Sequence, residues 1–511
     1  MSSDANRRQF LGSAAAAAAF SIGPRNVLGG TGYVAPSDQI NLAYIGTGTQ
    51  GLREIGPLLA SPDIRITAVC DPNKNDGDYR DWDRNSLLSS LRRLVHAPNW
   101  LPGGTIPGGR DVGQSVVETY YASQKASGTY KGCAAYADFR EMFEKEKGID
   151  AVKIMTPDHL HGVIAIAAMR RGKHVITHKP LANRLQEVQQ AIDIARQSQV
   201  STHLMPWDSN GDMTPVMNWI HEGAIGTLRE VHNWSNRPVW PQYATIPTDR
   251  PPVPAGLDWD LWLGPESERP YHPNYTNMVF RGWYDFGGGS MADMGHYSLW
   301  TVFNALDLSG PTSIEPMMTH ACMLRDGVST TIRNDFSFPL AAVVRFRYPA
   351  RGARGPVDLI WYDGGIHPPT PPELDEDGAE LPAEGMLFVG DKGKILAGFR
   401  VENPRLIPQA RMKGIAMPPA PERPRSDGAE PPPLSPGLTQ WIAACRGAKE
   451  HSPGSFLNAS GISEAVNLYA AALRIGKRLS YKADISTITN VPDSGRYLSR
   501  YYRLGWNPLT I

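Results

Sequence analysis

The chain has 511 residues, of which 41% are hydrophobic and 20% are charged, as expected of a folded globular protein with two or more domains. Its 51 basic and 51 acidic residues give a formal net charge of zero, which argues against a nucleic acid or an anionic membrane as partner. The four cysteines are scattered and form no Cys-x-x-Cys pair, so neither a zinc site nor a disulfide framework is predicted.

Residues 1–35 are expected to lie outside the fold. The sequence NRRQFL at 6–11 is similar to a twin-arginine export signal, and the Ala-rich run at 14–20 is too short to span a membrane. We expect a periplasmic or otherwise exported protein with no stable membrane span after signal removal. The alternatives are a disordered basic N-terminus and an uncleaved anchor. Twin-arginine export carries folded proteins, which suits an enzyme that binds its nucleotide before it leaves the cytoplasm.

Residues 40–71 have the order of a strand, a glycine-rich turn, a helix and a second strand. The parts are an apolar strand over 40–45, the G-x-G-x-x-G spacing of Gly46, Gly48 and Gly51, a helix over 52–59, a strand over 64–69 and Asp71. The glycines permit a tight turn, close approach of the backbone to a pyrophosphate and close packing of the helix. This context predicts a dinucleotide site, against the alternative of an ordinary glycine-rich loop.

The same pattern predicts the cofactor contacts. The N–H groups at the helix N-terminus favour an anion, so we expect the pyrophosphate there. The residues expected to hold it are Gly46, Gly48, Thr49, Gln50 and Gly51. A carboxylate at the end of the second strand, here Asp71, can accept hydrogen bonds from the ribose hydroxyls, which favours NAD over NADP.

The first domain is expected to be a Rossmann domain over residues 38–181 with an insertion over 73–132. The insertion is predicted to contain short helices at 87–95 and 116–123, either near the adenosine side of the cofactor or on an oligomer surface. The expected elements after it are a helix over 138–147, a strand over 151–155, a helix over 161–171 and a strand over 175–177. Ligands bind at the carboxyl ends of the strands in such a sheet, and His178 and Lys179 follow the last of them.

The second domain is expected over residues 182–490, with a large open, mostly antiparallel sheet and helices on one side. The predicted helices are 185–198, 216–222, 438–445 and 462–473, and the predicted strands are 228–234, 312–323, 341–348, 357–361 and 386–389. A Pro-rich stretch over 407–436 predicts an extended loop. The aromatic and basic tail, residues 491–511, is expected to pack on the body or on a neighbouring subunit.

From about residue 38 to 480 the chain resembles the glucose–fructose oxidoreductase/inositol dehydrogenase (Gfo/Idh/MocA) family. The resemblance rests on the glycine motif, Asp71, TPDHLH at 156–161, HKP at 178–180 and ADMGHYSLW at 292–300. It implies an α/β protein with an N-terminal Rossmann domain and a C-terminal α/β domain whose open sheet is often an oligomer interface. It also implies NAD(P) between the domains, a sugar, glycoside or polyol substrate, and a homo-oligomer.

Two positions depart from the family pattern. His178 stands where the family usually has the Glu of a Glu-Lys-Pro tripeptide, while Lys179 is retained. Tyr297 stands four residues after Asp293, where a histidine is usual, and His296 precedes it. Both the tyrosine and the export signal resemble an exported branch of the family that holds its nucleotide tightly.

Lys179 is the candidate base for removing the O–H proton of an alcohol while a hydride leaves its carbon. A lysine with its ordinary pKa of about 10.4 needs burial or a cationic neighbour to act near neutral pH. His178 is such a neighbour in sequence, but adjacent strand positions point to opposite faces, so a structural histidine is an equal alternative. The alternative for Lys179 is a surface lysine near a turn.

Asp293 and Tyr297 are expected on one face of a helix, where they can bind substrate hydroxyls and relay a proton. His296 lies about 100° around that helix from Tyr297, so we favour Tyr297 as the residue that faces the site. The remaining candidates are cofactor contacts at Thr156, Pro157, His161, His178 and Lys179, and substrate contacts at His161, His178, Arg237, Trp240, Asp293, His296 and Tyr297. No metal site is expected.

The leading functional prediction is an NAD(P)-dependent oxidoreductase that acts on a sugar, glycoside or polyol with a tightly bound, recycled cofactor. One alternative is an NAD-dependent glycosidase or lyase that works by oxidation, elimination and re-reduction, with His161 or His178 as a second base. The other is a non-catalytic protein that binds a nucleotide or a sugar on the same fold.

Overall fold

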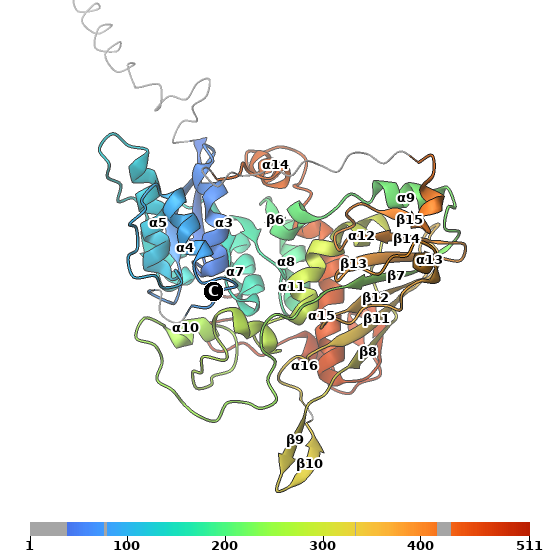
Figure 1. Cartoon of the computed structure of the whole chain (residues 1–511). Coiled ribbons are helices and arrows are strands. Elements are labelled where there is room, and N and C mark those ends of the chain that lie inside the picture. Colours follow the sequence, from blue (N-terminus) through green and yellow to red (C-terminus); the bar gives the residue numbers. More distant parts are fainter. Residues whose placement is uncertain (1–37, 76–78, 333, 416–430) are drawn as a thin grey trace, which may run out of the picture.

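The computed structural model describes residues 38–75, 79–332, 334–415 and 431–511. The predicted export signal and residues 416–430 of the predicted Pro-rich loop therefore lie outside the described residues. The described chain forms two sheets that lie side by side, each covered by helices (Figure 1).

The first sheet is parallel and has six strands in the order β3-β2-β1-β4-β5-β6. The strands are β1 (Ile40–Ile45), β2 (Ile64–Cys70), β3 (Ala134–Tyr136), β4 (Ala151–Ile154), β5 (His174–Thr177) and β6 (Thr202–Leu204). The strand order reverses between β1 and β4, and such a reversal opens a crevice at the carboxyl ends of the strands. Because β6 lies beyond residue 181, the sheet extends past the predicted first domain, and that boundary stays a prediction.

Six helices accompany this sheet. They are α3 (Thr49–Ala60), α4 (Ser86–Leu94), α5 (Arg110–Ser123), α6 (Phe139–Lys145), α7 (Asp158–Arg170) and α8 (Leu185–Gln197). α4 and α5 belong to the predicted insertion, and they pack on α3 and β2. α7 is buried from Asp158 to Met169, which fits a helix that is apolar on nearly all sides.

The second sheet has nine strands in the order β15-β14-β13-β7-β12-β11-β8-β16-β17. They are β7 (Leu228–Trp234), β8 (Ser313–Met318), β11 (Ala342–Tyr348), β12 (Val357–Tyr362), β13 (Gly385–Gly390), β14 (Lys394–Ala397), β15 (Arg405–Ile407), β16 (Leu479–Lys482) and β17 (Thr487–Ile488). Only the β7–β12 pair is parallel, so the sheet is mostly antiparallel, as predicted.

The strand predicted over 312–323 is divided in the structure. Its first part is β8, while its end begins a separate two-stranded hairpin of β9 (Cys322–Arg325) and β10 (Val328–Thr331). This hairpin projects from the body (Figure 1) and exposes Leu324 and Val328.

The remaining helices follow β6 along the chain. They are α9 (Thr214–His221), α10 (Trp259–Leu263), α11 (Gly289–Ser298), α12 (Trp300–Ala305), α13 (Pro372–Glu376), α14 (Pro436–Cys445), α15 (Ser460–Ile475) and α16 (Gly495–Leu498). α11 packs on α15. The tail after α16 packs on the body, where the Trp506 side chain is buried.

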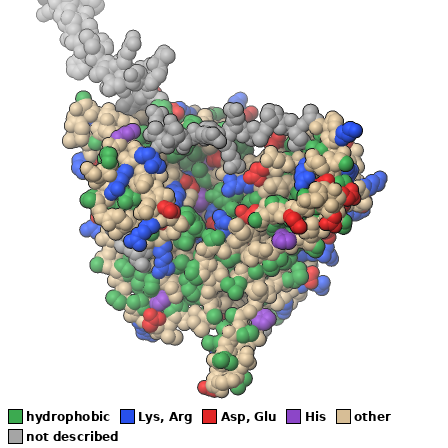
Figure 2. All heavy atoms as spheres, viewed as in Figure 1, with side chains coloured by type: hydrophobic (Ala, Val, Ile, Leu, Met, Phe, Trp, Pro, Cys, Tyr) green, Lys and Arg blue, Asp and Glu red, His purple; other side chains and the backbone are tan. Residues whose placement is uncertain are grey.

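On the face drawn in Figure 2, basic side chains lie on both halves of the molecule and have acidic side chains among them. This distribution agrees with the balanced charge of the whole chain. No helix in the described part of the chain combines the length and apolar character needed to cross a membrane.

Candidate functional site

A cavity of about 330 Å³ opens at the carboxyl ends of the parallel strands. One part of its wall comes from the β1–α3 turn and the segments after β2, β4 and β5, and the other part comes from α11 and loops of the second half. Of the predicted site residues, the cavity is lined by Gly46, Gly48, Thr49, Gln50, Gly51, Asp71, Thr156, Pro157, His178, Lys179, Arg237, Asp293 and Tyr297.

The glycine turn has the close packing that a dinucleotide site requires. Gly46 has a φ of +95°, and a Cβ there would lie 2.5 Å from the backbone carbon of Met155. A Cβ on Gly51 would lie 2.2 Å from the Gly46 carbonyl oxygen. Gly48 caps α3 without a side-chain acceptor, so the N–H groups of the first turn remain for an anion. These residues fit the pyrophosphate of a dinucleotide.

Asp71 lies at the cofactor side of the cavity and is buried. Its carboxylate accepts hydrogen bonds from the backbone N–H groups of Thr47 at 2.8 Å and Asn73 at 2.9 Å. Burial raises the pKa of this carboxyl from 3.8 to about 6, although the two backbone N–H groups lower it. Asp71 is therefore fixed beside the glycine turn, and its contact with a ribose stays a proposal.

Lys179 and Asp293 form a buried ion pair, with Lys179 Nζ donating to Asp293 Oδ1. Burial lowers the pKa of the lysine, although Asp293 raises it. Burial raises the pKa of Asp293, but Lys179 and Arg281 outweigh it and hold that pKa at about 2. Asp293 is therefore ionised at neutral pH, and Lys179 gives up its proton more readily than a surface lysine.

His178 and Tyr297 form the second polar pair of the cavity. His178 Nε2 lies 2.8 Å from the Tyr297 hydroxyl and 3.2 Å from Glu54 Oε1. Glu54 also accepts a hydrogen bond from Lys153 Nζ at 2.8 Å. Burial lowers the His178 pKa to about 4, although Glu54 raises it, so the ring is neutral at pH 7. Because β5 ends at Thr177, the strand alternation stops before His178, and both His178 and Lys179 reach the cavity.

The structure does not bring His161, His296 or Trp240 to the cavity wall. His161 lies between two backbone carbonyls, with Nδ1 2.7 Å from the Pro180 oxygen and Nε2 2.7 Å from the Thr156 oxygen. It connects the segments after β4 and β5, and its contact with cofactor or substrate stays a prediction.

The other two residues lie behind the wall. His296 is fully buried, and its Nε2 lies 3.4 Å from Ser463 Oγ on α15. The His296 side chain points away from the cavity because it lies about 100° around α11 from Tyr297, which lines the cavity. Trp240 is buried, and the Arg281 guanidinium carbon lies 6.0 Å from the centre of its ring. Neither residue lines this cavity, and the substrate contacts predicted for them stay predictions.

The sequence reasoning missed three charged residues at the site. Arg281, on η3 (Asn277–Gly282), has Nε 3.3 Å from Asp293 Oδ1. Arg400 lies between β14 and β15, with its guanidinium carbon 4.9 Å from the centre of the Tyr297 ring. Glu54 lies within α3 and reaches His178. None of the three belongs to a motif, although Glu54 falls one helical turn after the glycine motif.

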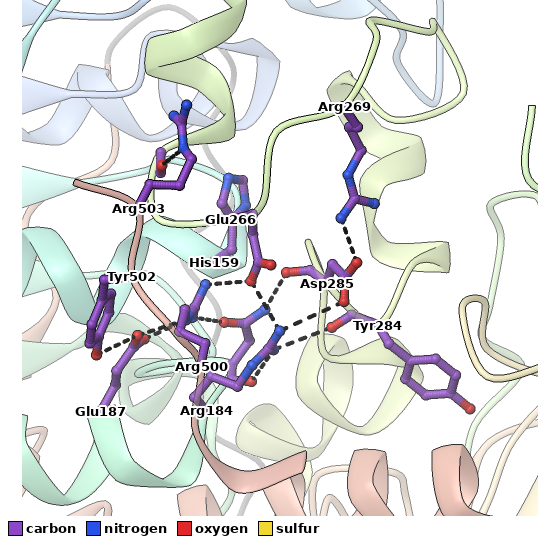
Figure 3. Close-up of polar contacts among 12 residues, drawn as sticks. His159, Arg184, Glu187, Glu266, Arg269, Tyr284, Asp285, Arg500, Tyr502 and Arg503 are labelled. Carbon is purple, nitrogen blue, oxygen red and sulfur yellow. Dashed lines mark hydrogen bonds and ion pairs between the residues drawn. The ribbon is translucent and has the colours of Figure 1, made fainter. Parts of the chain in front are cut away.

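A second polar network fixes the loops that form the far wall (Figure 3). Arg500, from the tail, donates one hydrogen bond to Glu266 at 2.7 Å and another to Glu187 on α8 at 2.9 Å. Arg184 donates to Glu266 at 3.0 Å, and His159 Nε2 donates to the Trp262 carbonyl at 2.9 Å. Because Trp262 lines the cavity, this network holds the cavity wall against α7 and α8.

Two models of one protein family match consecutive parts of the chain. The model described as "Oxidoreductase family, NAD-binding Rossmann fold" matches residues 113–205. The model described as "Oxidoreductase family, C-terminal alpha/beta domain" matches residues 218–330. The matched parts include β4 and β5 of the parallel sheet and α11 of the second half.

Curated relatives match over shorter stretches. Levoglucosan dehydrogenase of Pseudarthrobacter phenanthrenivorans is 34% identical over 111 residues, which are 20% of this chain and 27% of that protein. A glycosyl hydrolase family 109 protein of Shewanella putrefaciens is 24% identical over 208 residues, which are 40% of this chain and 37% of that protein. The chain therefore aligns with well under two thirds of either relative.

Solved structures align over more of the chain at lower identity. The WlbA dehydrogenase from Bordetella pertussis, solved in complex with NADH and UDP-GlcNAcA, is 15% identical with a TM-score of 0.48. That alignment covers 87% of this chain and 99% of the other. Residues 113–205 and 218–330 of this chain therefore match the two domains of the Gfo/Idh/MocA oxidoreductases, a family with an NAD-binding Rossmann fold.

Proposed function

We propose that this protein is an NAD-dependent oxidoreductase that oxidises a secondary alcohol carbon of a sugar, glycoside or polyol. The observation that carries the proposal is the buried Lys179–Asp293 pair in the same cavity as the glycine turn. A base and a dinucleotide turn that share one cavity meet the two needs of hydride transfer from an alcohol.

In this proposal the residues of the chain hold the substrate and move its proton. Lys179 in its neutral form takes the O–H proton at Nζ, and Asp293 stabilises the ammonium group that results. Tyr297 and His178 lie next to this pair and pass the proton on toward Glu54. When bound, the nicotinamide ring supplies the hydride acceptor.

The Gly46–Gly51 turn and the N-terminus of α3 would hold the pyrophosphate, with Asp71 at the adenosine ribose. A carboxylate at that position opposes the 2′-phosphate of NADP, which favours NAD. We also propose that the chain is exported through its twin-arginine sequence and forms a homo-oligomer. Free NAD is absent outside the cytoplasm, so such an enzyme would keep its cofactor bound and recycle it.

Two measurements test this function. Mass spectrometry of small molecules released when the purified protein is denatured should find near one NAD per chain. Lys179→Met should reduce turnover at least ~100-fold, in line with the loss of a general base, and leave the released NAD unchanged. Lys147→Met, at an exposed lysine, is the matched control and should keep full turnover. Equal turnover of both variants would contradict Lys179 as the base, and no turnover of any tested sugar by the unchanged protein would leave the non-catalytic alternative.

The glycosyl hydrolase family 109 relatives support a second candidate, cleavage of a glycoside through oxidation, elimination and re-reduction. That chemistry needs a second base at the carbon next to the oxidised one. Of the two predicted bases, His178 lines the cavity and is neutral at pH 7, whereas His161 does not line it. Release of the phenol from an aryl glycoside without net NADH formation would favour this candidate, and steady NADH formation would contradict it.

A further inference from the structure

The substrate end of the cavity has more positive than negative side chains. Among the described residues, four cations line the cavity: Lys179, Arg237, Arg281 and Arg400. The carboxylates that line it are Asp293, at the same end, and Asp71, beside the glycine turn. With Lys179 neutral, as the proposed function requires, the three arginines still exceed the two carboxylates by one charge.

Three of the cations lie around the Asp293 carboxylate, and Arg281 also lies 3.9 Å from Asp158 Oδ1. Lys179 donates to Asp293 Oδ1, Arg281 Nε lies 3.3 Å from that oxygen, and Arg237 Nε lies 3.8 Å from Oδ2. Within the described part of the chain, the Nε atoms of Arg237 and Arg281 are buried and have no hydrogen-bond acceptor. A buried N–H group without an acceptor is unfavourable, so this end of the cavity favours a ligand that supplies acceptors.

Arg400 has no carboxylate partner among the described residues, and its side chain makes no hydrogen bond to them. The Arg400 guanidinium lies over the Tyr297 ring. Lys179 Nζ lies 5.6 Å from the centre of the same ring, and His178 Nε2 lies beside the Tyr297 hydroxyl. Tyr297 and Asp293 lie one turn apart on α11, so Arg400 and Arg237 approach the same turn of that helix.

NAD does not balance this charge. Its pyrophosphate belongs at the glycine turn, and its oxidised nicotinamide ring is itself a cation. We propose that the substrate, within the oxidoreductase function proposed above, is a sugar that bears a carboxylate or a phosphate, bound by Arg237 and Arg400. The planar guanidinium group pairs with either anion through two parallel hydrogen bonds.

Calorimetry on the NAD-loaded protein tests this inference without requiring turnover. The probes are D-glucuronate, D-glucose 6-phosphate and neutral D-glucose. We expect one anionic probe to bind about 10- to 100-fold more tightly than glucose, the range for hydrogen bonds to a charged group. A preference for glucuronate identifies a sugar acid, and a preference for the phosphate identifies a sugar phosphate.

Two variants at Arg400 and one elsewhere complete the test. Arg400→Gln should abolish the preference for the anionic probe, while Arg400→Lys should keep most of it. Arg229→Gln, at an exposed arginine paired with Asp391, should leave all three affinities unchanged. Failure of both anionic probes to bind more tightly than glucose, or an unchanged preference in Arg400→Gln, overturns the inference. The oxidoreductase proposal fails separately, if anionic sugars bind but no NADH forms with any sugar.

Discussion

Lys179 gains its candidate role from the residues around it. Burial lowers its pKa from the ordinary value of 10.5, and Arg281 lowers it further, while Asp293 raises it. The His178 ring does not titrate near neutral pH, because burial lowers its pKa to about 4. Within this cluster, Lys179 is therefore the group proposed to take up the substrate proton.

The pH dependence of kcat/KM should follow Lys179. Activity needs the neutral amine, so log kcat/KM should rise with pH and level off above the Lys179 pKa, with no step near pH 6.5 from His178. Asp293→Asn removes the carboxylate that favours the ammonium form. The rising limb should then move to lower pH by about 1–3 units, the usual effect of one close opposite charge. If log kcat/KM rises over the same pH range in Asp293→Asn as in the unchanged protein, the role of this pair is contradicted.

At the residue scale, the sequence predicted what belongs to a motif. The glycine turn, which was recognised from its spacing, lines the cavity. Lys179, Asp293 and Tyr297 also line it, and they were recognised from motifs that resemble those of the family. Arg281 and Arg400 were missed because they come from segments without a periodic pattern, and only tertiary structure brings them to α11. The position of His161 between two backbone carbonyls was not predicted, since spacing does not show which groups surround a buried ring.

At the scale of elements, the wall of the cavity depends on a tail that contributes no residue to the cavity lining. The Arg500 side chain is 4% exposed and lies between the carboxylates of Glu187 and Glu266. Without Arg500, Glu266 would still be paired with a second cation, Arg184. Glu187 would keep a hydrogen bond from the Tyr502 hydroxyl, which carries no charge. Arg500 is therefore the counter-charge of a buried carboxylate on α8.

Removing this cation should destabilise the protein. Arg500→Met leaves Glu187 buried beside a hydroxyl group alone, and breaking a buried pair in this way costs about 3–5 kcal/mol. Arg496→Gln, in the same tail but at an exposed side chain, should cost much less. Urea unfolding followed by circular dichroism measures both. Equal losses in the two variants would mean that Arg500 contributes no more than a surface charge.

Sequence patterns predicted elements better than their boundaries. The strands β1, β2 and β7 lie where apolar runs predicted them, because a buried strand needs an apolar sequence. β3 and β6 have three residues each and were missed, since so short a run carries no period. The split between β8 and the β9–β10 hairpin was missed for another reason: β-branched and apolar residues continue through the connection.

At the scale of the whole molecule, the two sheets share one core. Ala43 on β1, Leu204 on β6, Ile314 on β8 and Phe388 on β13 belong to one continuous cluster of buried apolar side chains. The cavity is also lined from both halves. Neither half can lose its structure without exposing apolar surface of the other, so we expect the described chain to unfold as one cooperative unit.

Cofactor binding should therefore stabilise both halves together. At an NAD concentration 100 times its Kd, the free energy of unfolding should rise by about 2.7 kcal/mol. The gain should appear in a single calorimetric transition, because the bound state involves residues of both halves.

Gly51→Ala should remove this gain, since the added Cβ would lie 2.2 Å from the Gly46 carbonyl oxygen. Gly148→Ala, with no heavy atom within 4 Å of the added Cβ, should keep it. Two separate transitions, of which NAD shifts only one, would show that the halves unfold independently despite their common core.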